Sequence, residues 1–378
     1  MEYMTPRERI EAALALRRPD RVPVAPDFDL YIARHAGITM HELLFDFKAA
    51  ERALEISYGY YQWDGNHLFI GGTGPYLQVV MSQDFLVPGV DGRGEDEILQ
   101  MVEVEAVGPE VYGEICRRGF LPVYLENLKR VLPVLRSGRG AARFLAGFQL
   151  YTLKVRKHLR KWEERGIPCL AGGVPGILAF DVFSGLRSFA AFCADLHRYP
   201  EEVLRALAVA NRFFIELLVR GAKASGARFC FIGSARPSAS FISPRQFERF
   251  ALPLFVEATE RLVEEGITPF LHFDSDWTPF LPYLKQLPAR KCVLDLDGTT
   301  DIFRAKEVLG DHMCIMGDVP ATLLTLGEPE EVEAYCERLI KEVGAGGGFI
   351  LSSGCSTPPD ARPENVEAMV ASVRKFVP

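Results

Sequence analysis

His272, Asp274 and Cys355 are the residues whose types and spacing best suit a chemical role. Residues i and i+2 of an extended chain point to the same side, so His272 and Asp274 can face one centre. Imidazole nitrogen, carboxylate oxygen and thiolate sulfur all bind zinc, and three protein ligands with an open fourth position are typical of catalytic zinc. Zinc at this centre would hold a thiolate as the nucleophile for a methyl group, or polarise a bound substrate.

Each of these residues also has a structural interpretation. A histidine such as His272 after a strand is often a hydrogen-bonded structural residue, and a free cysteine such as Cys355 is often a small buried hydrophobe. Asp295 and Asp318 can cap the helices or turns that follow them. Asp276 can begin a helix. On spacing alone, both interpretations stay open.

The second half of the chain alternates between short apolar runs and longer stretches with helical spacing. The apolar runs are rich in β-branched and aromatic residues, which predicts strands at 168–172, 228–232, 267–271, 291–296, 313–316 and 348–351. Helices are expected at 200–223, 278–287, 301–309, 329–343 and 363–376, and another begins at Ser243 with a capping box. Strands that alternate with helices are typically parallel and joined by crossovers.

Polar, charged or glycine residues follow these strands. In a parallel barrel the C-terminal strand ends meet at one mouth, where catalytic groups lie, although an open doubly wound sheet gathers its ligands there too. The number of strand and helix units favours the barrel, so we predict an α/β fold, a (β/α)8 TIM barrel with an N-terminal helical extension. Further candidates for lining the cavity are Asp27, Asp64, Asp276 and Asp318. Gly317 and Gly173 would let the backbone approach a ligand closely.

The first half of the chain is less regular. A helix is expected at 6–17, a strand at 21–25, and further helices near 39–60 and 109–135. The segment 71–97 is rich in Gly, Pro and Asp, which predicts a lid or a hairpin rather than a linker. Because no composition break marks a domain boundary, we expect one domain over 1–378, with 1–65 forming the N-terminal extension and the first strand.

Composition excludes several classes of protein. The 378 residues include 43 Lys and Arg against 50 Asp and Glu, a formal net charge of −7, whereas proteins that bind the nucleic-acid backbone usually have a basic surplus. The sequence shows no signal-peptide pattern and no apolar run long enough to span a membrane. The eight cysteines form no CxxC pair and lie mostly in apolar runs, as reduced buried thiols do. We therefore expect a soluble, cytoplasmic protein that binds neither nucleic acid nor membrane.

The C-terminal part of the sequence resembles the uroporphyrinogen decarboxylase superfamily. The likeness is carried by Met316-Gly-Asp-Val-Pro, Phe349-Ile-Leu-Ser-Ser-Gly-Cys-Ser and Pro363-Glu-Asn-Val. It is strongest over 268–375, and a weaker likeness reaches back to Thr5-Pro-Arg-Glu-Arg and Arg21-Val-Pro-Val. The resemblance implies a TIM barrel with its active site at the C-terminal mouth.

Within that superfamily, the sequence is more similar to corrinoid-linked methyltransferases of the methylcobalamin:coenzyme M type. Those enzymes carry His-x-Cys and a later Gly-Cys as zinc ligands, and His272 and Cys355 match these positions. Asp274 replaces the first of the two cysteines, which makes the metal more electrophilic. The methyl acceptor or donor therefore stays open between a thiol, a methoxy compound, an amine and a folate. If the ligand set fails, Asp274 would act as an acid or base in a metal-free site.

The decarboxylases of the superfamily differ at two other places. They carry an N-terminal arginine motif that holds propionate carboxylates, and a Gly-His-Gly near the C-terminus. Here the corresponding regions read Ala25-Pro-Asp-Phe-Asp-Leu and Gly354-Cys-Ser. Acidic residues that face a polycarboxylate would repel it, which disfavours uroporphyrinogen decarboxylation.

The resulting hypothesis is a methyltransferase that binds zinc through His272, Asp274 and Cys355 and works with methylcobalamin or a corrinoid protein on a small-molecule substrate. One alternative is uroporphyrinogen decarboxylase, a carboxy-lyase that needs no metal. The other is a non-catalytic barrel that binds a tetrapyrrole or a corrinoid. The resemblance to the superfamily also implies a homodimer.

Overall fold

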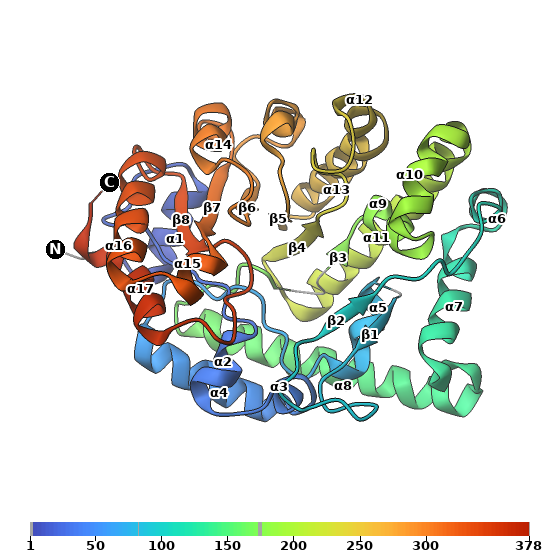
Figure 1. The fold of residues 1–378 in the computed structure, drawn as a ribbon, viewed down its shortest axis with the longest axis horizontal. Coiled ribbons are helices and arrows are strands. Elements are labelled where there is room, and N and C mark those ends of the chain that lie inside the picture. The colour runs from blue at the N-terminus through green and yellow to red at the C-terminus, as the bar shows by residue number, and fades with distance from the viewer. Residues whose placement is uncertain (1–2, 82, 173–175, 378) are drawn as a thin grey trace.

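A parallel sheet forms the centre of the molecule (Figure 1). The computed structural model describes residues 3–81, 83–172 and 176–377. The sheet has six strands in the order in which they occur in the chain. They are β3 (Gly176–Ile177), β4 (Phe229–Ser234), β5 (Thr268–Phe273), β6 (Val293–Leu296), β7 (Cys314–Val319) and β8 (Phe349–Ser353). Each strand runs parallel to the next, as the sequence predicts.

Two other predicted strands take part in the sheet only through single bridges. Val24 bridges Leu351 of β8, and Asn66 bridges Cys169, both in parallel orientation. A hydrogen bond of 2.7 Å from the Asp64 amide to the Val24 carbonyl links the segment that contains Asn66 to the segment that contains Val24. The segments predicted as strands at 21–25 and 168–172 therefore continue the sheet without forming ladders of their own, and the fold is TIM-barrel-like.

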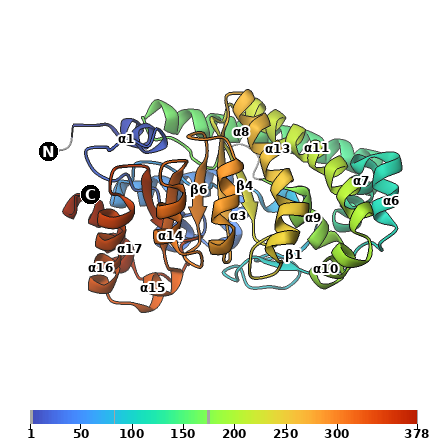
Figure 2. The same cartoon turned by 90° about the horizontal axis from the view of Figure 1, so that it is seen from above.

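Helices on the outer face of the sheet join its strands. In the second half they are α11 (Pro200–Ser225), α12 (Pro244–Gln246), η3 (Phe247–Ala251), α13 (Leu252–Glu264), η4 (Thr278–Gln286), α14 (Ile302–Leu309), α15 (Ala321–Leu326), α16 (Pro329–Arg338), η5 (Leu339–Val343) and α17 (Pro363–Lys375). Both views show α13 and α14 beside the strands (Figures 1 and 2). The capping box predicted at Ser243 is present. The helix predicted at 278–287 is a 3-10 helix, and Pro282 inside it cannot donate the hydrogen bond that an α-helix needs.

The first half supplies the remaining helices and a separate hairpin. The helices and strands are α1 (Pro6–Leu14), α2 (Tyr31–Ala36), α3 (Met40–Phe45), α4 (Phe47–Tyr61), η1 (Gly74–Tyr76), α5 (Leu77–Met81), β1 (Asp84–Leu86), β2 (Gln100–Val102), α6 (Val111–Arg118), α7 (Phe120–Val131), η2 (Pro133–Arg136), α8 (Gly138–Glu164), α9 (Ala179–Leu186) and α10 (Phe189–Arg198). Strands β1 and β2 are antiparallel, so the hairpin predicted within 71–97 extends to residue 102. The helix predicted at 109–135 is divided by Gly119, which has a φ of +80°.

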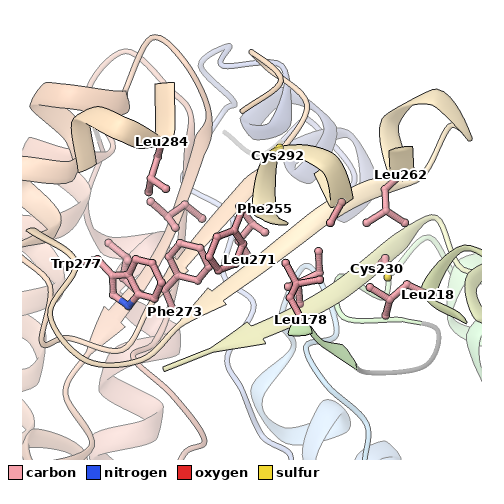
Figure 3. Packing of buried hydrophobic residues seen from close by; sticks show 14 of the residues in the cluster. Leu178, Leu218, Cys230, Phe255, Leu262, Leu271, Phe273, Trp277, Leu284 and Cys292 are labelled. Atoms are coloured by element: carbon pink, nitrogen blue, oxygen red, sulfur yellow. The ribbon is translucent and has the colours of Figure 1, made fainter. Parts of the chain in front are cut away.

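Apolar side chains pack on both faces of the sheet. On the outer face, Phe273 of β5 meets Phe255 of α13, with ring centroids 5.2 Å apart (Figure 3). On the inner face, Phe270 of β5 packs in a second cluster with Ile10 of α1. Because successive side chains of a strand point to opposite faces, His272 lies on the inner face with Phe270.

Helix α1 packs against the end of the central sheet at which the strands begin. Its Ile10 and Ala13 share the inner cluster with the first residues of β4, β6 and β7, namely Phe229, Val293 and Cys314. The predicted N-terminal helical extension therefore covers this end, and polar groups on the inner face lie toward the opposite end. None of the described helices is long and apolar enough to cross a membrane. The eight cysteines are free thiols, as the sequence predicts.

Candidate metal centre

Three side chains meet where β5 and β8 end. His272 lies on β5, Asp274 directly follows that strand, and Cys355 follows β8. The Nε2 atom of His272 is 3.3 Å from Asp274 Oδ1 and 3.4 Å from Cys355 Sγ. One ligand atom of each residue lies within 4.8 Å of the other two. The structure thus brings together the three residues that the sequence predicts as zinc ligands.

Backbone contacts position the two strand ends. The Asp274 amide donates a 3.0 Å hydrogen bond to the Ser234 carbonyl, which extends the pairing of β4 and β5 by one residue. Gly354 lets the end of β8 approach the loop after β6, because a Cβ at this position would lie 2.3 Å from the Asp297 carbonyl oxygen. Any side chain at 354 would therefore displace the neighbouring cysteine.

Asp295 orients the imidazole of His272 from behind. Its Oδ2 atom lies 2.6 Å from His272 Nδ1, so Nδ1 carries a proton and Nε2 faces Asp274 and Cys355. Burial opposes a charge on His272, but the carboxylate of Asp295 and the hydrogen bonds with Asp274 and Cys355 together outweigh burial and raise the pKa of His272 well above its usual value. Burial likewise opposes the carboxylate of Asp295, but His272 and His67 together outweigh burial and lower the pKa of Asp295. A carboxylate behind a histidine is a frequent arrangement at metal sites, where the metal takes the place of the second proton.

The thiol of Cys355 is protonated at neutral pH in the absence of a metal. Burial raises its pKa to about 11, and the hydrogen bond from His272 offsets only part of that rise. A coordinated thiol is deprotonated by the charge of the metal, so metal binding here would release protons. The nitrogen, oxygen and sulfur donors of the three residues together fit zinc.

His67 is a member of the site that sequence reasoning missed. Its Nε2 lies 3.0 Å from Asp295 Oδ2, and its Nδ1 lies 3.2 Å from Asp27 Oδ1. Burial lowers the pKa of His67, but these two carboxylates outweigh burial and raise it to about 10. Asp295 therefore stands between two imidazoles, and His67, His272 and Asp295 form a second group with metal-binding geometry. The signal available in the sequence was a histidine in the apolar run Leu68-Phe-Ile after a polar segment.

The acidic segment that contains Asp27 and Asp29 lies beside this site. Besides its contact with His67, Asp27 donates from its amide to Ser353 Oγ at 3.1 Å. Asp29 accepts a 2.9 Å hydrogen bond from Ser356 Oγ. Burial and the neighbouring carboxylate of Asp27 raise the pKa of Asp29 well above its usual value. Several buried carboxyl groups therefore lie close together at the carboxyl ends of the strands, and their mutual repulsion opposes full ionisation.

Asp64 lies elsewhere, which corrects its prediction as a substrate-binding residue. Its carboxylate accepts hydrogen bonds from Arg9 at 3.1 Å and from Arg21 at 2.6 Å. It also accepts one from the Val24 amide at 3.0 Å. Because both carboxylate oxygens are engaged by these donors, Asp64 serves as a buried ion-pair partner of the N-terminal segment.

Three further candidates make contacts within the protein. Gly317 packs against β6, where a Cβ would lie 2.6 Å from the Leu296 carbonyl oxygen. Asp318 accepts a 2.8 Å hydrogen bond from Tyr335 of α16, and burial raises the pKa of Asp318 to about 7. Asp276 accepts a 2.8 Å hydrogen bond from the first amide of η4, so its structural interpretation holds. Gly173 lies outside the described residues.

A cavity of about 270 Å³ opens beside His272 and Asp274. Its walls are mostly apolar and include Ile177 of β3 and Phe231 of β4. Asp181 lines the cavity and accepts a 2.6 Å hydrogen bond from Ser234 Oγ. Other lining residues, Gln83 and Met101, come from the hairpin segment. The cavity therefore offers room for a small molecule next to the His, Asp and Cys donors.

The parallel sheet and the polar centre at its strand ends define a TIM-barrel-like protein whose site lies at the carboxyl ends of the strands. A family model described as uroporphyrinogen decarboxylase (URO-D) matches residues 151–376, well over half of the chain. The chain belongs to the uroporphyrinogen decarboxylase family, which confirms the predicted superfamily. Its members are enzymes.

Two curated proteins and one solved structure illustrate what this chain is similar to. The uroporphyrinogen decarboxylase of Syntrophotalea carbinolica is 25% identical over 229 residues, which are 60% of this chain and 65% of that protein. That of Methylococcus capsulatus is 30% identical over 118 residues, which are 31% of this chain and 33% of that protein. The matches thus span less than two thirds of these relatives. A methyltransferase from Methanosarcina mazei shares the fold, with a TM-score of 0.65 over 99% of both chains at 19% identity.

Proposed function

We propose that this chain is a methyltransferase that binds zinc through His272, Asp274 and Cys355 and works with a corrinoid. The observation that supports the proposal most is the convergence of three different donor atoms on one point, with Asp295 behind His272. Such a mixed set of nitrogen, oxygen and sulfur donors suits zinc. When bound, zinc supplies Lewis acidity, which lowers the pKa of a coordinated thiol or hydroxyl or polarises a bound substrate.

The residues of the chain would prepare this site in two ways. Asp295 keeps the proton of His272 on Nδ1, so that Nε2 faces the metal position. Asp274 and His272 also line the cavity, so a substrate in the cavity can reach the open side of the three donors. The methyl donor or acceptor would be a small thiol, methoxy, amine or folate compound.

The size of the cavity constrains how a corrinoid could take part. A volume of about 270 Å³ holds a small substrate, whereas a corrin macrocycle is several times larger. Methylcobalamin, free or carried by a corrinoid protein, would therefore approach from the mouth rather than enter the cavity. The residues at the strand ends fit a small reacting group, and the corrin would stay outside them.

Metal analysis of the purified protein tests the zinc part of the proposal. We expect about one zinc per chain, and Cys355→Ala should lower zinc affinity by more than about a hundredfold, because even residues outside the ligand shell contribute ~10–100-fold. Cys193→Ala is the matched control, since Cys193 is also a half-buried free thiol on another element. Less than about a tenth of an equivalent in the wild type after reconstitution with zinc would contradict the proposal.

Uroporphyrinogen decarboxylase is the second candidate, because the relatives at 25% and 30% identity carry that name. Asp27 and the buried Asp29 oppose it, since neither supplies the positive charge that would hold a substrate rich in carboxylates. Turnover of uroporphyrinogen by the metal-free protein would favour this candidate, whereas zinc-dependent demethylation of methylcobalamin would favour methyl transfer. Cytoplasmic location and a homodimer stay predictions, which cell fractionation and sedimentation would test.

A further inference from the structure

A second cavity, of about 260 Å³, lies between α8 and the segment 66–79. The β1–β2 hairpin contributes to both cavities, because Phe85 and Leu99 line this one while Gln83 and Met101 line the one beside His272. Nothing in the proposed methyl transfer uses this second cavity. Its walls show which kind of molecule it would hold.

The second cavity has aromatic and uncharged walls. Its aromatic lining comes from both sides and includes Phe69, Tyr76, Phe85, Phe148 and Tyr151. The described residues that line it include no aspartate, glutamate, lysine or arginine. His67 belongs to the wall, but its two nitrogens face Asp27 and Asp295. A charged ligand would therefore lose its hydration without gaining a partner of opposite charge.

The threonine and serine hydroxyls of the wall donate to backbone carbonyls. Thr73 donates to the Ile70 carbonyl at 2.7 Å, and Thr152 donates to the Phe148 carbonyl at 3.0 Å. His158 differs from them. Its side chain is 1% exposed, and its Nε2 atom is buried without a hydrogen-bond partner among the described residues. A buried polar atom without a partner usually costs about 1–3 kcal/mol, so a ligand that satisfies it gains correspondingly.

The surroundings of His158 determine what Nε2 can accept. Its Nδ1 lies 3.2 Å from Glu51 Oε1, and the hydrogen bond with His158 lowers the pKa of Glu51, which therefore stays a carboxylate. A carboxylate only accepts, so Nδ1 carries the proton. Burial lowers the pKa of His158 and keeps the ring neutral, which leaves a lone pair on Nε2. Phe69 stacks on the ring with centroids 4.0 Å apart and fixes its plane.

We propose that this second cavity binds a neutral aromatic molecule with one hydroxyl group, which donates its hydrogen bond to His158 Nε2. An apolar cavity of roughly 150 Å³ is enough for benzene, so about 260 Å³ has room for a two-ring compound. This inference concerns a site separate from the metal centre, and it does not depend on the proposed methyl transfer.

Three probes of one shape test the chemistry on the wild-type protein by fluorescence titration. We expect 2-naphthol to bind at one molecule per chain, and naphthalene to bind about two- to tenfold more weakly because it lacks the hydrogen bond. The anion 2-naphthoate should not bind at the same concentrations, because the wall offers it no cation. Equal affinity for 2-naphthol and naphthalene, tighter binding of 2-naphthoate, or no saturable binding would overturn the proposal.

Two variants place the binding in this cavity. In His158→Phe, 2-naphthol should bind no better than naphthalene, whereas His35→Phe, which replaces another histidine stacked on an aromatic ring, should preserve the difference. Val155→Trp fills the cavity from α8 and should abolish binding of both compounds. Full binding by a folded Val155→Trp protein, or an undiminished preference for 2-naphthol in His158→Phe, would place the ligand elsewhere and refute the assignment.

Discussion

Both ends of the central sheet contain buried carboxylates, but the partners of these carboxylates differ between the two ends. At the end covered by α1, Asp64 and Asp20 are paired with arginines, and the hydrogen bonds from Arg9 lower the pKa of Asp20 despite burial. At the mouth, Asp295 faces two histidines and leaves its Oδ1 atom without a hydrogen-bond partner among the described residues. Asp29, also at the mouth, has a strongly raised pKa.

This difference separates a structural charge cluster from a candidate site. Arginines and backbone amides satisfy the first cluster, so its charges hold the N-terminal segment in place. In the second cluster, carboxylates face histidines, which can give up a proton to a metal, instead of arginines, which cannot, and buried groups of that kind are concentrated at functional sites. A charge removed from each cluster should therefore have opposite consequences for stability and for metal binding.

The largest expected effect is on stability, from Asp64→Asn. This change removes a charge whose side chain is 1% exposed and breaks its 2.6 Å ion pair with Arg21, which typically costs about 3–5 kcal/mol for a buried pair. We expect a clear fall in the midpoint of urea unfolding, while folded protein retains zinc. Normal stability combined with loss of zinc would show that Asp64 belongs to the metal site and would break the comparison.

Asp295→Asn should have the reverse profile. The amide keeps the shape of the side chain but removes the charge behind His272, and such changes lower metal affinity by about 10–100-fold. Stability should fall less than in Asp64→Asn, because His272 and His67 can lose a proton when the charge of Asp295 is removed, whereas Arg21 stays charged. Zinc affinity can be measured by competition with a chromophoric chelator, with Asp301→Asn, a substitution at the cap of α14, as the control. Equal zinc affinity in both variants would show that Asp295 does not support the metal.

The comparison also explains which parts of the site were predictable from the sequence. His272, Asp274 and Cys355 were found because each follows or ends a strand with a clear apolar run. His67 was missed because its segment joins the sheet only through the bridge at Asn66 and has no strand pattern. Asp64 was misassigned because sequence alone does not show that a residue lies at the start of a strand rather than at its end.

The secondary structure likewise contains elements that the sequence predicted and elements that it did not. Strands β4 to β8 follow the predicted runs closely, since each is a short apolar segment buried on both faces. Helix α8, with 27 residues, was not predicted. Its apolar residues recur at helical spacing, at Phe144, Phe148, Tyr151, Val155, Leu159 and Trp162, but no helix was assigned to this stripe. Phe148, Tyr151 and Val155 line the second cavity, and only His158, Leu159 and Trp162 of α8 are buried.

A smaller effect is expected from Asp318→Asn, and it depends on pH. Burial raises the pKa of Asp318 to about 7, so the folded protein binds a proton at this group more tightly than the unfolded chain, whose value is near 3.8. The stabilisation is complete below about 3.8 and is lost as pH rises through about 7. Asp318→Asn should therefore gain stability relative to wild type between pH 4 and 8, by about 1–2 kcal/mol. The unfolding midpoints of both proteins, measured from pH 4 to pH 8, test this. A stability difference that stays constant over this pH range would contradict the titration of Asp318.

The smallest effect on stability is expected from Asp276→Ala. Asp276 is close to the metal centre in sequence but is not one of the proposed zinc ligands. Losing the hydrogen bond to the Thr278 amide should lower stability by about 0.5–1 kcal/mol, because that bond satisfies the first amide of η4. Zinc affinity should stay within about twofold of wild type, whereas Asp274→Ala, two residues earlier, should lose zinc. Parallel metal titrations of the two variants make this the finest test of the division between structural and metal-binding carboxylates. If both variants lose zinc alike, the boundary of the site lies beyond Asp274.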